Sequence, residues 1–458
     1  MNRSILVIFM LICQFLPGRF QITAAADTPV SKIEDDSTLR ITLRDSWFTE
    51  TPARIQAKKT EYHTLQGGSK IQVRYEAGTD EFGVVLAREL QNPANNANPY
   101  PGWAQGSWIL TRRKSDGAPL RIRIFLRSDQ YTYVQFRPFT ADKCQMDVVL
   151  YNAYIIQSLP LAVSFDRLMV LPVADVLALA GSRFPVKYFE PEPNMYRDTR
   201  TFVAAVRSGL PGLHFTDDGA IDENGNYVFI KTLENQNPAA PQETGGLNCS
   251  GFAKWVVDGI LKPVTGVRLP VAPLKLPFNN RGSSFTEIWD SILDPFFGLD
   301  WIRNLASRAG EALRSASYTS LDEFEVRTWP FSQLIIRSNN SAALRPYPGF
   351  LADAGFGVEG LQPLLYTLAI DEPNRIYLAA VNDEIGAPTT ADNPRGLPRM
   401  RRYFHVAVLV PYFDESGNFQ ITVFESAAET SFNAFRNRYP GCYVNLVRIP
   451  VDGNFDPN

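Results

Sequence analysis

The sequence predicts an α+β protein, with a β-rich N-terminal domain at residues 27–180 and a mixed domain at residues 198–458. Short runs of alternating apolar and polar residues dominate the first region, and this period of two is typical of strands. The helical period appears only later, and the last strands are joined by short polar turns. Strands and helices that are segregated in this way indicate an α+β rather than an alternating α/β architecture. A chain of 458 residues is long enough for about two or three domains.

The first 26 residues predict a secretory signal peptide that is not part of the fold. Arg3 gives a positive start, residues 5–13 are unbroken apolar, and Ala24–Ala26 place small residues before Asp27. We therefore expect an exported protein, periplasmic or extracellular, with no membrane-spanning segment in its mature form. Removal of the segment leaves 43 basic and 48 acidic side chains, so that the net charge changes from −3 to −5. This charge does not favour nucleic acid as a partner.

The N-terminal region contains six runs with strand composition. Arg121, Arg123 and Arg127 follow one another with apolar neighbours between them, which predicts a sheet with one solvated face. Residues 27–44 are polar, and we expect them to be frayed. The predicted strands, and the short helix that follows them, lie at residues 70–75, 82–86, 107–111, 120–126, 131–136, 146–156 and 173–180.

A linker is predicted at residues 181–197, where Pro185, Pro191 and Pro193 stand among polar neighbours. The helices of the mixed domain place apolar residues on one face and are expected at residues 198–208, 247–261 and 301–317. A long, largely helical insertion is expected at about residues 263–370. The strands of the mixed domain are expected at residues 376–381, 403–412, 419–425 and 443–451, with a hairpin loop at residues 414–418.

Three cysteines follow the predicted signal peptide: Cys144, Cys249 and Cys442. An odd number in an exported protein leaves at least one thiol free or paired between chains. A disulfide between Cys144 and Cys442 is one possibility, although three cysteines do not make a disulfide scaffold. We expect no metal and no organic cofactor, and the pattern predicts no oligomeric state.

Cys249 is the first candidate for a reactive group. Asn248 is a good N-cap, so the helix predicted there begins at Cys249. A helix N-terminus lowers the pKa of a thiol through its dipole and its exposed N–H groups. Ser250 and Gly251 are small enough to leave the sulfur accessible. The alternative is an inert, buried cysteine, which is a common role for a free thiol.

A nucleophilic cysteine needs a base, and His405 is the only one of three histidines that lies in a predicted strand of the mixed domain. A buried structural role is the alternative for this residue. Glu425 is the one charged residue on the apolar face of the next strand, and it could orient the imidazole. A hairpin centred at Glu415 sets Glu425 opposite His405. A centre half a residue later sets Ser426 there, so that either residue could be the third member.

Residues 246–252, Gly-Leu-Asn-Cys-Ser-Gly-Phe, resemble the nucleophile motif of the NlpC-type cell-wall cysteine peptidases. The strand that begins with His405-Val406 is similar to the histidine strand of that family, and Phe424-Glu425-Ser426 stands where its members carry a third polar residue. The resemblance covers about residues 200–262 and 374–452. Three features depart from the family pattern. Asn248 stands where Asp is commoner, an insertion of about 100 residues separates the cysteine from the histidine, and the N-terminal β region resembles no cell-wall-binding repeat.

The resemblance implies a papain-like core and the cleavage of amide bonds, in particular those of peptidoglycan stem peptides. Cys249 would be the nucleophile, His405 its acid–base partner and Glu425 the residue that orients His405. Asn248 and Ser250 would contact the substrate. The backbone N–H of Cys249, at a helix start, is a candidate oxyanion donor.

Two other functions suit the same residues. A transglutaminase-like or amidase-like acyl transferase uses the same order of cysteine, histidine and carboxylate. A non-catalytic envelope-binding module could keep a degenerate papain-like core and leave recognition to the N-terminal domain. Of the three, we expect a cysteine peptidase or amidase.

Overall fold

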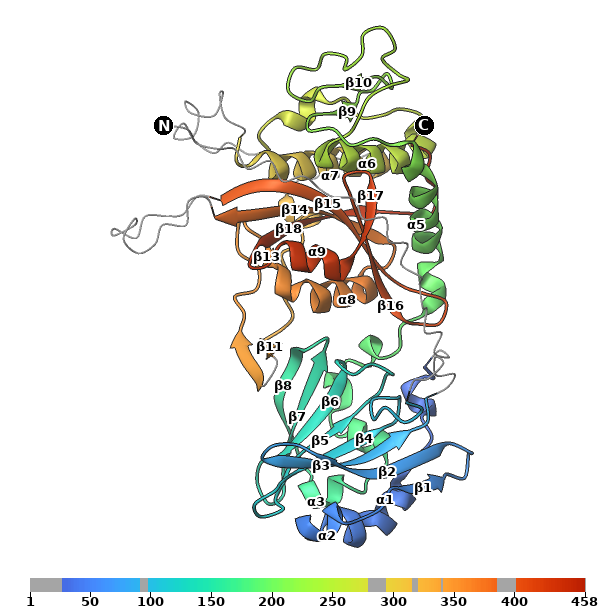
Figure 1. Ribbon diagram of the computed structural model, residues 1–458, viewed down its shortest axis with the longest axis vertical. Coiled ribbons are helices and arrows are strands. Elements are labelled where there is room, and N and C mark those ends of the chain that lie inside the picture. Colours follow the sequence, from blue (N-terminus) through green and yellow to red (C-terminus); the bar gives the residue numbers. More distant parts are fainter. Residues whose placement is uncertain are drawn as a thin grey trace, which may run out of the picture.

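The computed structural model describes residues 27–90, 98–278, 294–314, 320–338, 341–384 and 401–457, so the predicted signal peptide at residues 1–26 lies outside the described residues. The chain forms a mixed α/β structure with two large antiparallel sheets in separate lobes of an elongated molecule (Figure 1). The predicted mixture of sheet and helix is confirmed at this level. Within the described residues, none of the helices combines the length and apolarity that a membrane span requires.

The larger sheet contains ten strands, each antiparallel to its neighbours. One face is buried, because Val84 and Val134 join Trp47 in a core formed with the N-terminal helices. In spatial order the strands are β1 (Glu61–Thr64), β2 (Lys70–Ala77), β3 (Glu81–Arg88), β4 (Trp108–Arg113), β5 (Pro119–Ile124), β6 (Tyr133–Pro138), β7 (Cys144–Leu150), β8 (Ala153–Leu161), β11 (Gln333–Ser338) and β12 (Ser341–Pro346). The helices of this lobe are α1 (Ser37–Leu43), α2 (Pro52–Gln56), α3 (Phe165–Leu168) and α4 (Val173–Ala178).

The prediction that residues 27–44 are frayed is wrong. Helix α1 lies in this segment, and its Arg40 is completely buried. The Arg40 guanidinium donates to the carbonyl oxygens of Met169 (2.8 Å) and Leu171 (2.7 Å), and it pairs with Asp36 at 2.8 Å. The polar residues are thus ordered because they bond backbone groups of the chain near α3 and α4.

The single strand predicted at residues 146–156 is two strands, β7 and β8. Tyr151 and Asn152 have φ values of 46° and 64°, and a two-residue turn with positive φ at both positions is a usual hairpin connection. The Tyr151 ring lies 5.0 Å from the ring of Tyr366 and 5.6 Å from that of Phe419, both of which belong to the other lobe. This turn therefore packs the first sheet against the second lobe.

The segment between the lobes, residues 181–197, forms short 3₁₀ turns and buries Tyr188, Phe189 and Tyr196. The largely helical insertion expected at residues 263–370 is only partly helical. It contains α7 (Phe297–Arg314) and α8 (Leu361–Asp371), but it also contains β11 and β12. This hairpin crosses to the first lobe, where Leu334 of β11 pairs with Ala153 of β8.

The second sheet lies between helices on both faces (Figure 1). Val408 and Val410 of its central strand pack in one core with Phe252 and Trp301, and Leu409 packs in the other with Leu364. Its strands, in spatial order, are β13 (Phe356–Gly357), β18 (Tyr443–Pro450), β14 (Arg375–Glu384), β15 (Arg401–Phe413), β16 (Phe419–Glu425) and β17 (Ala428–Ser431). The other helices of this lobe are α5 (Arg197–Gly209), α6 (Cys249–Thr265) and α9 (Phe432–Arg438).

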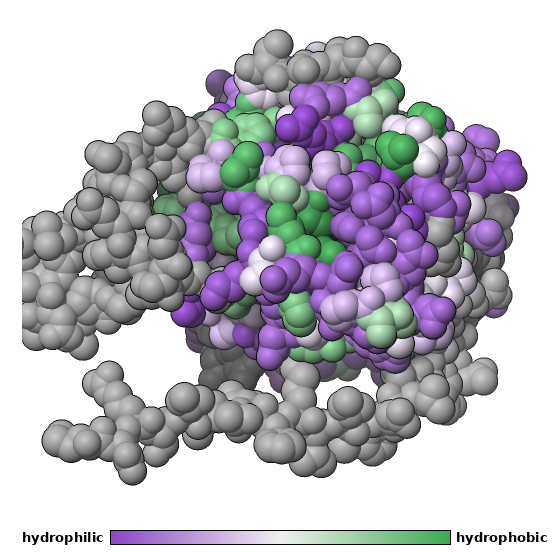
Figure 2. All heavy atoms as spheres, turned by 90° about the horizontal axis from the view of Figure 1, so that it is seen from above, coloured by the Kyte–Doolittle hydropathy of each residue, from purple (hydrophilic) through white to green (hydrophobic). Residues whose placement is uncertain are grey.

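A small hairpin of β9 (Ala220–Ile221) and β10 (Tyr227–Val228) lies over α6, at the end of the molecule far from the first sheet (Figure 1). Residues 222–226 form its turn, which the N–H of Asp222 closes by donating to the carbonyl of Asn226 at 2.9 Å. Seen from this end, the surface is largely hydrophilic, with a small apolar area near its centre (Figure 2).

Candidate active site

The thiol of Cys249 lies at the start of α6, as predicted. Asn248 is the N-cap, with an extended backbone, and its Oδ1 accepts the Gly251 N–H at 2.7 Å. The first N–H groups of a helix have no acceptor four residues earlier, so the N–H of Cys249 is free of the helix ladder and points to its N-terminal end. A negative charge on the sulfur is therefore favoured by the helix terminus.

The residues that follow Cys249 are small because another segment lies against them. A Cβ atom at Gly251 would lie 1.9 Å from the carbonyl oxygen of Gly219, so only glycine fits there. Ser250 is 3% exposed, and its carbonyl accepts the indole N–H of Trp301 at 2.8 Å. These contacts fix the first turn of α6 between the segment before β9 and helix α7.

His405 is placed beside Cys249 by an irregularity in β15. Val381 of β14 pairs with His405, and the next residue, Asn382, pairs with Tyr403. Phe404 is therefore an extra residue in β15, which is the definition of a β-bulge. The bulge re-aims the side chains at this end of the strand, and Phe404 is 38% exposed at the edge of the site.

Glu425 bonds His405, although the predicted hairpin register is wrong. Val408 pairs with Phe424, so the hairpin is centred at Ser416 and, continued by one residue, sets Glu425 opposite Ala407. His405 is then the diagonal neighbour of Glu425, on the same face of the sheet. The carboxylate Oε2 lies 2.7 Å from His405 Nε2. Ser426 is the first residue of a turn with φ of 50°, and it lines the pocket rather than bonding the imidazole ring.

The charges of the three side chains support one another. Burial opposes ionisation of the Cys249 thiol, but hydrogen bonds from His405 and from the Val406 backbone, with the charge of His405, hold its pKa below the ordinary value. Burial would lower the pKa of His405, but Cys249 and Glu425 raise it to about 9. Burial would raise the pKa of Glu425, but His405 and Arg438 lower it. The site therefore favours a thiolate beside an imidazolium.

Two contacts at the end of α9 were missed from the sequence. Arg438 Nη1 donates to Glu425 Oε1, and the ring of Tyr439 lies 5.5 Å from the imidazole ring of His405. No local pattern marks these residues, because β17 and most of α9 separate them from Glu425 in the chain.

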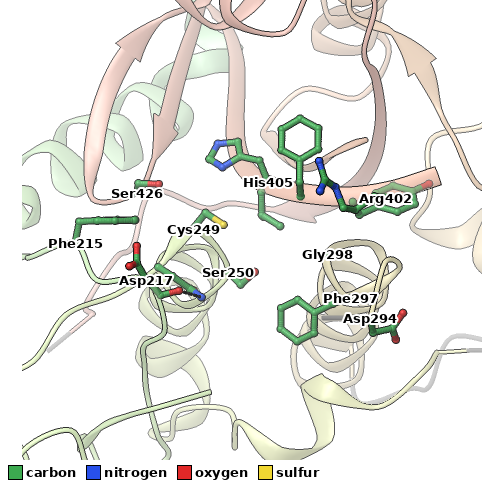
Figure 3. A pocket seen from close by; sticks show the side chains of 14 residues that line it. Phe215, Asp217, Cys249, Ser250, Asp294, Phe297, Gly298, Arg402, His405 and Ser426 are labelled. Atoms are coloured by element: carbon green, nitrogen blue, oxygen red, sulfur yellow. Dashed lines mark hydrogen bonds between the residues drawn. The ribbon is translucent and has the colours of Figure 1, made fainter. Parts of the chain in front are cut away.

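The sulfur opens into a pocket of about 400 Å³. Figure 3 shows that the pocket extends to both sides of Cys249, with Phe215, Asp217 and Ser426 on one side and Phe297, Asp294 and Arg402 on the other. Asn248 and Ser250, the predicted substrate contacts, both line it. However, Asn248 Oδ1 is already engaged as the helix cap, and Ser250 is almost completely buried.

The other two cysteines take no part in the site. Cys144 and Cys442 are both free thiols, so the disulfide considered between them is not formed. Burial raises the pKa of Cys144 to about 11, which makes it an inert thiol. Among the described residues there is no group of three or more His, Cys, Asp and Glu side chains arranged to hold a metal ion.

Comparison of the chain with known protein families and structures gives a match for the N-terminal lobe alone. Neither a curated protein nor a solved structure matches the chain. Residues 29–188 match the model of a family described as a domain of unknown function (DUF8515). That match covers β1 to β8 and ends before α5, so it includes none of the residues around Cys249.

Proposed function

We propose that the protein is an exported cysteine hydrolase that cleaves amide bonds, in particular those of peptidoglycan stem peptides. One observation carries the proposal. The Cys249 thiol lies at a helix N-terminus and lines one pocket with His405, whose Nε2 is 2.7 Å from the buried Glu425 and whose positive charge lowers the pKa of the thiol. Burying a carboxylate and an imidazolium costs several kcal/mol unless they are paired. Such a set of groups is expected where a thiolate is needed for chemistry.

The steps follow from the positions of the groups. The Cys249 thiolate attacks the carbonyl carbon of the amide and forms the C–S bond, while the N–H of Cys249 donates to the oxyanion. The imidazolium of His405 protonates the leaving nitrogen as the C–N bond breaks, and an acyl-enzyme remains. Neutral His405 then takes a proton from water, whose oxygen attacks the thioester and restores the thiolate and the imidazolium. Glu425 keeps the imidazole in the required orientation throughout.

The shape of the pocket supports cleavage within a peptide chain rather than at its end. Residues line the pocket on both sides of the sulfur (Figure 3), so a bound chain can continue past the scissile bond in both directions. Asp217 lies on one side, and Arg402 lies with Asp294 on the other, so charged groups of both signs line the pocket and suit a substrate that carries charged groups itself. Stem peptides of peptidoglycan, with carboxylates and amino groups along a short chain, have this character.

The test is incubation of the full-length protein with purified peptidoglycan, with the released fragments identified by mass spectrometry. We expect stem-peptide fragments from the wild type and from Cys442→Ala, a control that changes a free thiol outside the pocket. We expect none from Cys249→Ala. Undiminished release from Cys249→Ala would overturn the proposal. Products that incorporate an added amine instead of water would assign acyl transfer, and binding without products would assign a recognition module.

A further inference from the structure

We propose that Arg438 is a positioning residue of this site, which holds the two side chains that fix the imidazole ring of His405. The proposal rests on the function proposed above and extends it beyond the three residues that the sequence predicts. It starts from the position of the Glu425 carboxylate, which is 5% exposed and has a cation at each oxygen. Oε2 contacts His405, and Oε1 accepts from Arg438.

Arg438 also contacts the second neighbour of the ring. Its guanidinium carbon lies over the face of the Tyr439 ring, 5.7 Å from the ring centroid, and the phenol helps to raise the pKa of Arg438. Tyr439 in turn packs against the ring of His405, at 5.5 Å between centroids and an angle of 32°. One guanidinium therefore holds the hydrogen-bond partner and the packing partner of the imidazole at the same time. Its planar set of donors suits this double contact better than a lysine ammonium would.

The imidazole of His405 on β15 is surrounded by Cys249 from α6, Glu425 from β16 and Tyr439 after α9, and Arg438 at the end of α9 contacts the last two. Without Arg438, Oε1 would lose its cation, and Glu425 would be easier to protonate and free to rotate. The sulfur would also lose one positive charge from its surroundings. Both effects disfavour the thiolate–imidazolium pair at acidic pH, so their signs agree.

The test measures alkylation of Cys249 by iodoacetamide between pH 4 and pH 10, which reports the thiolate without needing a substrate. Peptide-resolved mass spectrometry separates Cys249 from Cys144 and Cys442. For Arg438→Met we expect the acid limb of the profile to move to higher pH, with alkylation about tenfold slower on that limb. Arg436→Met is the matched control, because Arg436 lies on the same helix and contacts Gln362 instead of the site.

Arg438→Lys gives a second reading if the methionine variant does not fold. A lysine keeps the charge but cannot hold Glu425 and Tyr439 together, so we expect a smaller shift in the same direction. An acid limb of Arg438→Met that coincides with the wild type would overturn the proposal, as would an equal shift in Arg436→Met. A wild-type Cys249 with the profile of an ordinary thiol would overturn the proposed function itself, and with it this inference.

Discussion

The contact between Glu425 and His405 allows a quantitative prediction for the variant Glu425→Gln. The substitution keeps the size of the side chain and removes its charge. It leaves an amide between an imidazole ring and the guanidinium of Arg438, two groups that both donate hydrogen bonds to the carboxylate. The imidazolium form of His405 then loses its negatively charged partner, whereas neutral imidazole loses little.

The size of the effect follows from the burial and the pKa of His405. Raising that pKa from 6.5 to about 9 corresponds to roughly 3 kcal/mol in favour of the imidazolium, shared between Cys249 and Glu425. A hydrogen bond to a charged partner is worth about 1.5–3 kcal/mol. We therefore assign about 2 kcal/mol to Glu425. This lowers the alkaline limb by about 1.5 pH units, from about 9 to about 7.5, because the equilibrium constant for holding the proton on His405 falls about thirtyfold.

The assay is the pH dependence of the release of stem-peptide fragments from peptidoglycan. Wild type should lose hydrolysis near pH 9, where His405 loses the proton that it donates to the leaving nitrogen, and Glu425→Gln should lose it at lower pH. Glu429→Gln is the control, because this carboxylate lies on the neighbouring strand and pairs with Arg207 outside the site. If the alkaline limb of Glu425→Gln coincided with that of Glu429→Gln, Glu425 would not act on His405 and the reasoning would fail.

Three further predictions follow from the same structure. Gly251→Ala should lower the free energy of unfolding by about 2–3 kcal/mol in urea titrations, because the added Cβ would meet the Gly219 carbonyl. Gly212→Ala is the control and should be nearly neutral, because a Cβ there meets open space. Arg402→Glu should raise the KM about threefold for peptides that place an acidic group near residue 402, and it should leave kcat unchanged. If the variant and the wild type preferred acidic over neutral peptides equally, this prediction would be contradicted. His405→Ala should cost about 2 kcal/mol more stability at pH 6 than at pH 9.5. A raised folded-state pKa stabilises fully below pH 6.5 and loses its effect by about pH 9, so equal losses at the two pH values would refute the assignment.

The candidate site could be predicted from the sequence because its signals are local. Asn248 and Cys249 occupy the N-cap and first position of a helix, and the strands that carry His405 and Glu425 have clear patterns. The predicted centre of the β15–β16 hairpin, Glu415, lies one residue before the observed centre, Ser416. A shift of that kind moves the pairing by two positions and keeps every side chain on its face, so the predicted pair survived as diagonal neighbours.

The features that could not be predicted depend on contacts between distant segments. The polar residues around Arg40 gave no sign that backbone carbonyls near residue 170 would order them. The strand pattern of Gln333–Ser338 is short, and nothing in it names β8 as its partner. Arg438 was missed for the same reason, because its role exists only once α9 packs beside Glu425.

The hairpin β11–β12 has a consequence for how the protein is made. During synthesis, residues 29–188 leave the ribosome long before Gln333. Until β11 is synthesised, the edge of β8 at Ala153–Tyr154 therefore has no strand of the same chain paired to it. An open strand edge invites pairing with other chains. A fragment cut at residue 188 would keep that edge uncovered permanently, and it would be more prone to self-association than the intact polypeptide.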